Sequence, residues 1–430
     1  MEIEHITLPN SLRVLLIDTK GASSATVLVL VRSGSRYEDA TNNGIAHFFE
    51  HMAFKGSAKY PDSFTISSTI EGMGGVCNAF TSKDHTGYWI KGTTAHLGTM
   101  LDVLADMLTA SKLEAVEIEK EKGVIVEEIN MYEDMPQHKV SNVYEALLYP
   151  KHPLGMDIAG SKKTVTSFTR QTFTDYIQRL YHPENATLVI AGGIGAVKQE
   201  LAQMVKKSFG VWLANPNPAA DYSYPRFEQQ ARNVNRDMFT KKTEQAHFIF
   251  GYATDYGYLD TRKHRLGVLA GVLGGGMSSR LFMEIREKRG LCYYIHTARD
   301  LYAETGALST AAGIRNSAQA VNEAIKIVMD EHQKIAQGTA EKDKLAADIA
   351  RVKEMLKGRL LLSLENSQSV ASFYGTKLLL EGKTQEPKDV IAALDAVTLE
   401  DVVQEAQAIV QTARLRFALV GPFAESDIVV

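Results

Sequence analysis

Short apolar runs alternate with amphipathic stretches along the chain. The run from Ala25 to Val31 has the length and composition of a strand. The segment GGVCNAFTSKDHTGYWI, residues 74–90, alternates like a hairpin of two strands that turns near Ser82 to Asp84. Helices are predicted within residues 44–56, GIAHFFEHMAFKG, and across residues 114–134. This alternation of strands and helices predicts an α+β fold.

The two halves of the chain end in the same pattern. In the first half, Thr169 opens a helical stretch and Gly192 closes the strand ATLVIAG. In the second half, Thr398 opens a helical stretch and Gly421 closes the strand LRFALVG. Each interval is 23 residues long. A helix-to-strand ending repeated at one spacing predicts two copies of one α+β unit.

A stretch rich in Pro and Asn, ANPNPAADYSYPRFEQQAR, divides the chain nearly in half. Chains longer than about 250–300 residues usually split into domains, and this one has 430 residues. We therefore predict a first half at residues 1–215, a linker at 216–232 and a homologous second half at 233–430.

Composition and charge narrow the classes of function. The chain is 45% hydrophobic with a formal net charge of −4 and has no Lys/Arg block, so nucleic acid is not an expected partner. The start, MEIEHITLPN, does not resemble a signal peptide, and no segment is expected to span a membrane. Two cysteines, Cys77 and Cys292, are too few for a disulfide framework. A reducing compartment, most simply the cytoplasm, is predicted.

Candidate chemistry begins in GIAHFFEHMAFKG. His47, Glu50 and His51 stand at positions i, i+3 and i+4, which lie on one face of a helix, so both imidazoles can reach one point. Such a pair suits a metal ion, and a catalytic zinc typically takes a third protein ligand and leaves one position for water. Hydrogen-bonded histidines of a protein core are the alternative reading of the same string.

The third ligand is expected from the helix at residues 114–134. A step of about 100° per residue places Glu121 and Glu128 near the middle of its apolar face and Glu127 on the opposite side. The residues that define this face are Val116, Ile118, Val124, Ile125, Val126, Ile129, Met131 and Tyr132. A carboxylate directed toward a core is costly unless it is paired or bound to metal. Glu128 is therefore the candidate ligand and Glu121 its candidate partner.

These residues carry a resemblance to a known family. The order H-x-x-E-H marks the inverzincins, and HFFEHMAFKG followed by EKGVIVEEINMYEDMP resembles the pitrilysin and mitochondrial-processing-peptidase family. In that family the ligand glutamate lies seven residues beyond a first glutamate and about 77 beyond the second histidine, spacings that Glu121, Glu128 and His51 match. The resemblance implies two homologous α/β-roll halves, each a mainly antiparallel sheet packed with helices, and a zinc site in the first half.

The resemblance also implies substrate contacts. GGGMSSRLFMEIREKRGLCYYI in the second half is similar to a segment that carries a substrate-binding arginine and tyrosine, here Arg286 and Tyr293. A solvated helix-end arginine and a packed strand tyrosine are the structural alternatives. The hairpin is similar to the family's edge strand, to which a peptide adds as a further strand. Asn78 and Ala79 are the candidates for that contact.

The activity implied is hydrolysis of a peptide bond by a zinc metalloendopeptidase. Zn2+ is the expected cofactor, with His47, His51 and Glu128 as ligands. Glu50 would act as general base on zinc-bound water, and Glu121 would orient a ligand histidine. A noncatalytic partner or scaffold subunit and a zinc hydrolase of small amides are the alternatives.

Assembly is the last expectation from the resemblance. Longer relatives close four such units into a chamber, whereas this chain has two. Since one chain carries both motif sets, a homodimer with a closed chamber is predicted, in which the partner copy supplies Arg286 and Tyr293. A heterodimer with a homologous chain is the alternative, and peptide is the expected substrate in either case.

Overall fold

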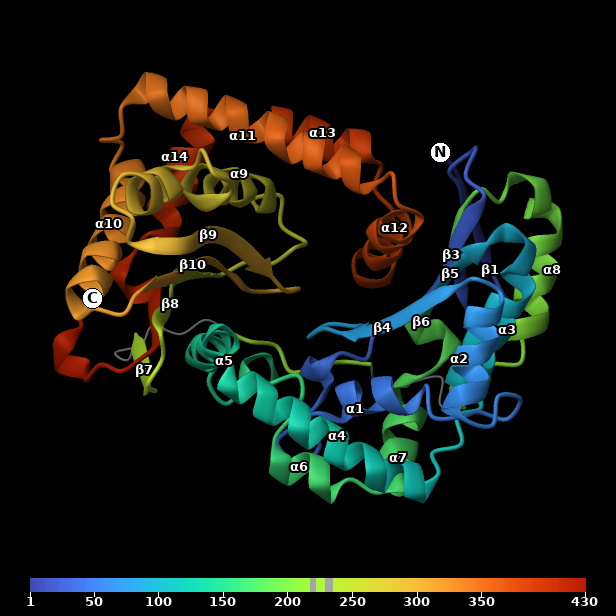
Figure 1. Ribbon diagram of the computed structural model, residues 1–430. Coiled ribbons are helices and arrows are strands. Elements are labelled where there is room, and N and C mark those ends of the chain that lie inside the picture. Colours follow the sequence, from blue (N-terminus) through green and yellow to red (C-terminus); the bar gives the residue numbers. More distant parts are fainter. Residues whose placement is uncertain (217–221, 229–234) are drawn as a thin grey trace. The chain divides into compact units, whose positions relative to one another are not determined.

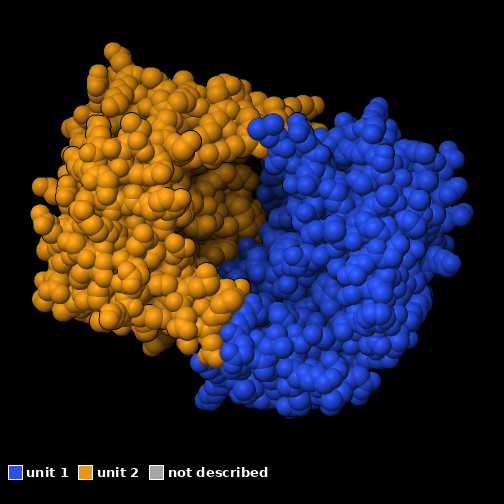
Figure 2. Space-filling model, in the orientation of Figure 1, with its two compact units in different colours: residues 1–129, 156–225, 362–385 blue, residues 130–155, 226–361, 386–430 orange. Residues whose placement is uncertain are grey.

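The computed structural model describes residues 1–216, 222–228 and 235–430. They form two compact units, which Figure 2 colours separately. Unit 1 comprises residues 1–129, 156–225 and 362–385, and unit 2 comprises residues 130–155, 226–361 and 386–430. Each unit is a sheet packed with helices (Figure 1). The predicted α+β fold is confirmed.

Unit 1 is built on a six-stranded sheet with the order β1-β2-β6-β3-β5-β4. The β2–β6 pair is parallel, whereas the other neighbouring pairs are antiparallel. The strands are β1 (Glu2–Thr7), β2 (Arg13–Asp18), β3 (Ser24–Val31), β4 (Val76–Thr81), β5 (Thr86–Thr93) and β6 (Ala186–Gly192). The predicted hairpin is β4–β5, and its turn is closed by a hydrogen bond from Ser82 N to His85 O of 2.9 Å.

Unit 2 is built on a five-stranded sheet with the order β7-β11-β8-β10-β9. Its strands are β7 (Arg236–Thr240), β8 (Gln245–Thr254), β9 (Cys292–Leu301), β10 (Gly306–Arg315) and β11 (Leu415–Gly421). Only the β7–β11 pair is parallel among these described strands. This order repeats β2-β6-β3-β5-β4 of unit 1 strand for strand, which supports two homologous copies.

The repeated ending of the two halves has the predicted form. Thr169 caps α7 (Arg170–Leu180), which leads to β6, and Thr398 caps α14 (Leu399–Ile409), which leads to β11. In both cases the threonine side chain accepts from the backbone of the third helical residue, and that residue's side chain accepts from the threonine N–H. This reciprocal capping box fixes the start of each helix.

Helices cover both sheets. Unit 1 contains α1 (Ile45–Met52), α2 (Ser63–Gly72), α3 (Leu97–Thr109), most of α4 (Ala115–Asp134), α6 (Lys162–Ser167), α7, α8 (Lys198–Phe209) and α12 (Ser367–Glu381). Unit 2 contains α5 (Pro136–Leu148), α9 (Lys263–Gly274), α10 (Ala318–Ala336), most of α11 (Lys342–Ser363), α13 (Pro387–Asp395) and α14. Within the described ranges, we find no helix with the length and apolarity that a bilayer crossing requires.

Two helices belong to the unit that the sequence order would not assign to them. The buried side of α12, including Tyr374, packs on Leu28 and Val189 of the unit 1 sheet. The buried side of α5, including Tyr144, packs on Ile249 and Ala418 of the unit 2 sheet. The compact units therefore differ from a simple division at the predicted linker. The first half of the sequence contributes α5 to unit 2, and the second half contributes α12 to unit 1.

The predicted linker, residues 216–232, is only partly described. Residues 217–221 and 229–232 of it lie outside the described residues. Of the described part, residues 222–225 belong to unit 1 and residues 226–228 to unit 2.

Candidate metal centre and active site

Helix α1 carries the H-x-x-E-H residues on one side and core residues on the other. The apolar side chains that anchor it in the core of unit 1 are Ile45, Phe48, Phe49 and Met52. Phe48 and Phe49 make edge-to-face contacts with Phe173 and Tyr181, respectively, at 4.9 and 4.7 Å between ring centroids. The opposite side of the helix presents the partly buried side chains of His47, Glu50 and His51.

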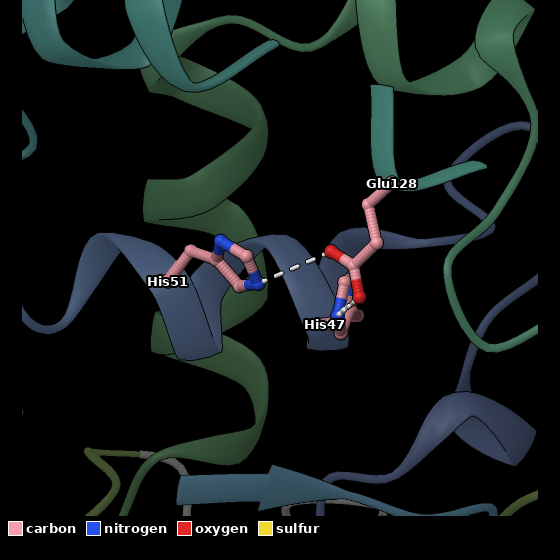
Figure 3. A group of neighbouring side chains, drawn as sticks. All are labelled: His47, His51 and Glu128. Atoms are coloured by element: carbon pink, nitrogen blue, oxygen red, sulfur yellow. Dashed lines mark ion pairs between the residues drawn. The ribbon is translucent and has the colours of Figure 1, made fainter. Parts of the chain in front are cut away.

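Helix α4 brings Glu128 to the two histidines. One carboxylate oxygen lies 3.6 Å from His47 Nε2, and the other lies 3.6 Å from His51 Nε2 (Figure 3). One ligand atom from each of the three residues lies within 4.8 Å of the others. Two imidazoles and one carboxylate are a donor set found in catalytic zinc sites. The residues that the sequence nominates as metal ligands are thus brought together, and the set fits zinc.

The buried face of α4 is narrower than its apolar pattern predicts. The apolar pattern places Val116, Val124 and Met131 on that face, yet they are 61, 51 and 50% exposed. The residues that are buried form one stripe, namely Ile118, Glu121, Ile125 and Ile129. They recur every three or four residues, so they point in one direction. Val124 and Met131 lie about a third of a turn around the helix from this stripe and Val116 lies nearly opposite it, so these three side chains stay in solvent. Glu121 lies within the stripe, as predicted, but Glu128 lies at its border and not near its middle. Glu127 is exposed, as predicted.

Glu121 links one metal-site histidine to a lysine. Its Oε1 lies 2.9 Å from His51 Nδ1, and its Oε2 lies 2.5 Å from Lys55 Nζ. Burial acts to raise the pKa of Glu121, but the hydrogen bonds from His51 and Lys55 outweigh it and hold the pKa below its usual range. An ionised carboxylate at Nδ1 leaves Nε2 of His51 directed toward Glu128. Lys55 was missed by the sequence reasoning, although it stands only four residues after His51, just beyond the end of α1.

The two histidines differ in their acid–base properties. Burial, together with the neighbouring His51, lowers the pKa of His47 to about 4. Burial alone would also lower the pKa of His51, but the hydrogen bond to Glu121 and the nearby carboxylates raise it. Neutral imidazole is the form that ligates metal. His47 is thus neutral near pH 7 before any metal binds.

Glu50 is held by the strand that borders the site. Thr81 at the end of β4 donates a hydrogen bond of 2.6 Å to Glu50 Oε2. Burial raises the pKa of Glu50, although the hydrogen bond from Thr81 acts in the opposite direction. A carboxylate with a raised pKa is a stronger base. Thr81 also gave no signal in the sequence reasoning, because a threonine in a strand is an ordinary residue.

The candidate peptide-binding residues lie on the edge strand of the unit 1 sheet. In the described sheet, β4 pairs with β5 alone, with Asn78 opposite Trp89 and Ala79 opposite Tyr88. Ala79 N–H donates to the side-chain oxygen of Asn78 at 2.8 Å. Thr81, which donates a hydrogen bond to Glu50, is the last residue of the same strand, so the open edge of β4 ends beside Glu50.

Arg286 and Tyr293 are brought together within unit 2. Arg286 lies in the π-helical turn Phe282–Glu287, and Tyr293 lies on the edge strand β9. The Arg286 guanidinium carbon is 5.5 Å from the centroid of the Tyr293 ring, which is 75% exposed. The tyrosine is therefore not the packed strand residue that the structural alternative required.

Comparison with known sequences identifies the family. The sequence model described as "Insulinase (Peptidase family M16)" matches residues 13–162, and the model described as "Peptidase M16 inactive domain" matches residues 167–352. A relative from Bacillus subtilis (strain 168), named "Uncharacterized zinc protease YmxG", is 35% identical over 403 residues, which cover 93% of this chain and 94% of that protein.

Solved structures share the fold over nearly the whole chain. A protease from Helicobacter pylori matches with a TM-score of 0.90 and 22% identity, over 98% of this chain and 99% of that one. A peptidase M16 inactive domain from Pseudomonas fluorescens matches with a TM-score of 0.85 and 17% identity, over 99% of both chains. Fold and sequence together define a two-domain peptidase architecture. The chain belongs to peptidase family M16, the insulinase family, in its short form, which confirms the resemblance inferred from its motifs.

Proposed function

We propose that the protein is a zinc-dependent endopeptidase that hydrolyses peptides or unfolded segments. The observation that carries the proposal is the place of Glu50. This carboxylate shares α1 with His47 and His51, and it accepts a hydrogen bond from Thr81 at the end of the open edge strand β4. A base thus lies between a metal-ligand set and a strand on which peptide can dock. The name zinc protease, given to the Bacillus subtilis relative, supports zinc as the metal.

The residues of the site would have separate roles in hydrolysis. His47, His51 and Glu128 would hold zinc, which when bound acidifies a water molecule and polarises the scissile carbonyl. Glu50 takes a proton from the attacking water and delivers it to the leaving amine. Glu121 keeps His51 oriented, since it occupies Nδ1 of that ring.

The substrate class follows from the edge strand. An extended peptide that pairs with β4 is recognised through its main chain, so sequence preference is left to side-chain pockets. Asn78 and Ala79 would contribute this pairing. Such recognition requires an extended segment, which short peptides and unfolded chains provide and a folded domain does not.

We propose further that the working enzyme is a homodimer with a closed chamber. This rests on the family resemblance and on the presence of both motif sets in one chain. Arg286 and Tyr293 of one protomer would contact peptide bound at the zinc site of the other, with the guanidinium supporting the developing oxyanion.

A noncatalytic subunit is the second candidate. It draws support from the description of the sequence model that matches residues 167–352, which is an inactive domain. His47, Glu50, His51 and Glu128 all lie in residues 13–162, which the insulinase model matches instead. The complete set in that range favours the peptidase.

The test is degradation of a mixed library of unstructured peptides, followed by mass spectrometry, with wild-type protein and Glu50→Gln. The substitution removes the base and leaves the three metal ligands in place, so cleavage should be lost while zinc is retained. A wild-type protein that binds zinc but cleaves no peptide would favour the noncatalytic subunit. Equal cleavage by the variant would refute Glu50 as the base.

A further inference from the structure

A buried carboxylate lies at the start of α1, the helix that carries His47 and His51. Glu38 is 2% exposed, and its Oε2 accepts hydrogen bonds from Gly44 N at 2.8 Å and from Asn43 Nδ2 at 3.0 Å. Its Oε1 accepts from Ala46 N at 2.8 Å. The first amides of a helix have no partner within the helix, and usually the residue directly before the helix supplies one. Here the acceptor comes from a residue six positions before Gly44.

The cap has to come from a distance because no side chain fits at the helix start. Gly44 has a φ of +97°, and a Cβ built there would lie 2.8 Å from Gly160 Cα. Gly160 has a φ of +80°, and a Cβ there would lie 2.5 Å from Asn43 O. The two backbones touch, so position 44 cannot carry the usual Ser, Thr or Asp cap.

Glu38 is itself fixed to the hairpin that borders the site. It follows the 3-10 turn Ser35–Tyr37, whose Ser35 N–H donates to Ser82 O at 3.0 Å. Arg36 pairs with Asp84 at 2.6 Å, and both side chains are nearly inaccessible. Ser82 and Asp84 form the β4–β5 turn, directly after Thr81. Glu38 thus connects the start of α1 with the β4–β5 hairpin, whose Thr81 donates a hydrogen bond to Glu50.

We propose that Glu38 is a positioning residue of the metal centre, which fixes the backbone immediately before His47 so that both imidazoles meet Glu128. The proposal rests on the proposed zinc function. A shift of the helix start would move His47 and His51 together, because both belong to the same two turns of α1. It would also move Glu50 relative to Thr81.

Energetics argue that this carboxylate serves position rather than stability. Burial raises the pKa of Glu38 to about 7, despite the hydrogen bonds from Gly44, Ala46 and Asn43. The charged or titratable side chains that act with it are Lys83, which favours its ionised form, and Tyr176, whose pKa its charge helps to raise. An ionised group that is costly to bury is a poor choice for stability alone, yet the Glu38 oxygens accept three hydrogen bonds from residues 43–46 at the start of α1.

The experiment compares Glu38→Gln and Glu38→Asp with wild type in two measurements. Zinc affinity is determined by competition with a chromophoric chelator, and backbone amide exchange of residues 43–52 is followed in the metal-free protein. A glutamine places an NH2 group against a backbone N–H, so zinc affinity should fall about tenfold or more, and exchange at the start of α1 should accelerate. Aspartate keeps the charge and should recover part of the affinity.

Asp106→Asn is the matched control. Asp106 is 7% exposed and accepts from the backbone N–H of Lys59 at 2.7 Å, but it lies on α3, away from the start of α1. Asp106→Asn should leave zinc affinity unchanged, whereas Glu38→Gln should weaken zinc binding. The melting temperature of Glu38→Gln should not fall enough to account for that weaker binding. An equal loss of zinc affinity in both variants would mean general destabilisation and would overturn the proposal.

The remaining outcomes are also decisive. Wild-type zinc affinity and wild-type exchange in a folded Glu38→Gln protein would refute the role of Glu38. If wild type itself binds no zinc, the proposed function fails, and exchange in the metal-free protein still tests whether Glu38 fixes α1. If Glu38→Gln does not fold, the same two measurements on Glu38→Asp decide, with wild-type values refuting the proposal.

Discussion

Glu38 makes a specific prediction for stability against pH. The pKa of this carboxyl rises from 4.5 to about 7 on folding, because the side chain is buried. A group whose pKa is higher in the folded state stabilises the fold when protonated, so its contribution is full below pH 4.5 and is lost as pH rises toward 7. At about 1.4 kcal/mol per pKa unit, the change is about 3 kcal/mol. Unit 1 is therefore expected to lose that much stability through Glu38 between acid and neutral pH.

The assay is thermal unfolding of metal-free protein followed by tryptophan fluorescence. Both tryptophans of the chain, Trp89 and Trp212, lie in unit 1, so the signal reports that unit. Wild type and Glu38→Gln are compared from pH 4.5 to 8.5, and the difference between them isolates Glu38. Other groups whose pKa changes on folding, such as His47, for which it falls from 6.5 to about 4, contribute to both proteins and cancel.

For a unit of this size, about 3 kcal/mol corresponds to about 6–12 °C in melting temperature. The melting temperature of Glu38→Gln relative to wild type should therefore rise by that amount as pH increases, and then level off above neutral pH. A difference that is constant with pH would show that Glu38 titrates normally in the folded protein. A difference of the opposite sign would show that the ionised form is the stabilising one, and the reasoning from burial would be wrong.

Three further predictions concern the site. Glu121→Ala should weaken zinc binding about 10- to 100-fold, measured by chelator competition, and Lys55→Met should weaken it less; equal affinity in all three proteins would separate the Glu121–Lys55 pair from the metal. Ala79→Pro removes a backbone donor of the edge strand, so KM for a peptide should rise about fivefold while zinc content stays the same; an unchanged KM would place the peptide elsewhere. Mixing Glu50→Gln with Arg286→Ala under conditions that allow subunit exchange should restore about half of the normal activity per mixed dimer by twofold symmetry; a mixture that stays inactive despite proven exchange would rule out sites completed by a partner copy.

Local signals in the sequence predicted much of the fold. Thr169 and Thr398 start their helices as expected, because a threonine cap acts through neighbours only three residues away. The turn at Ser82 to Asp84 is equally local. The choice of Glu128 over Glu127 also needed only helical periodicity. These features depend on short-range geometry, which the order of residues fixes.

Long-range features were out of reach for the same reason. An amphipathic pattern shows that α5 and α12 each bury one side, but it does not show which sheet receives it, so their exchange between the units could not be predicted. Glu38 stands in a polar loop sequence, GSRYEDATNN, yet it is 2% exposed, and the charged and titratable groups that act with it, Lys83 and Tyr176, lie far along the chain. Lys55 acts on a residue of α4, 66 positions away. The role of Lys55 appears only once the segment that follows α1 packs against α4.

Zinc content and turnover, measured on the same three preparations, test the central claim most directly. Elemental analysis of the purified wild-type protein should find about one zinc per chain, and peptide cleavage should stop when a chelator removes it. Glu50→Gln should retain the metal and lose cleavage, because it removes the base and no ligand. His51→Ala combined with Glu128→Gln should lose both. If the double variant keeps its zinc, or if Glu50→Gln cleaves peptide at the wild-type rate, the assignment of ligands and base to this site is contradicted.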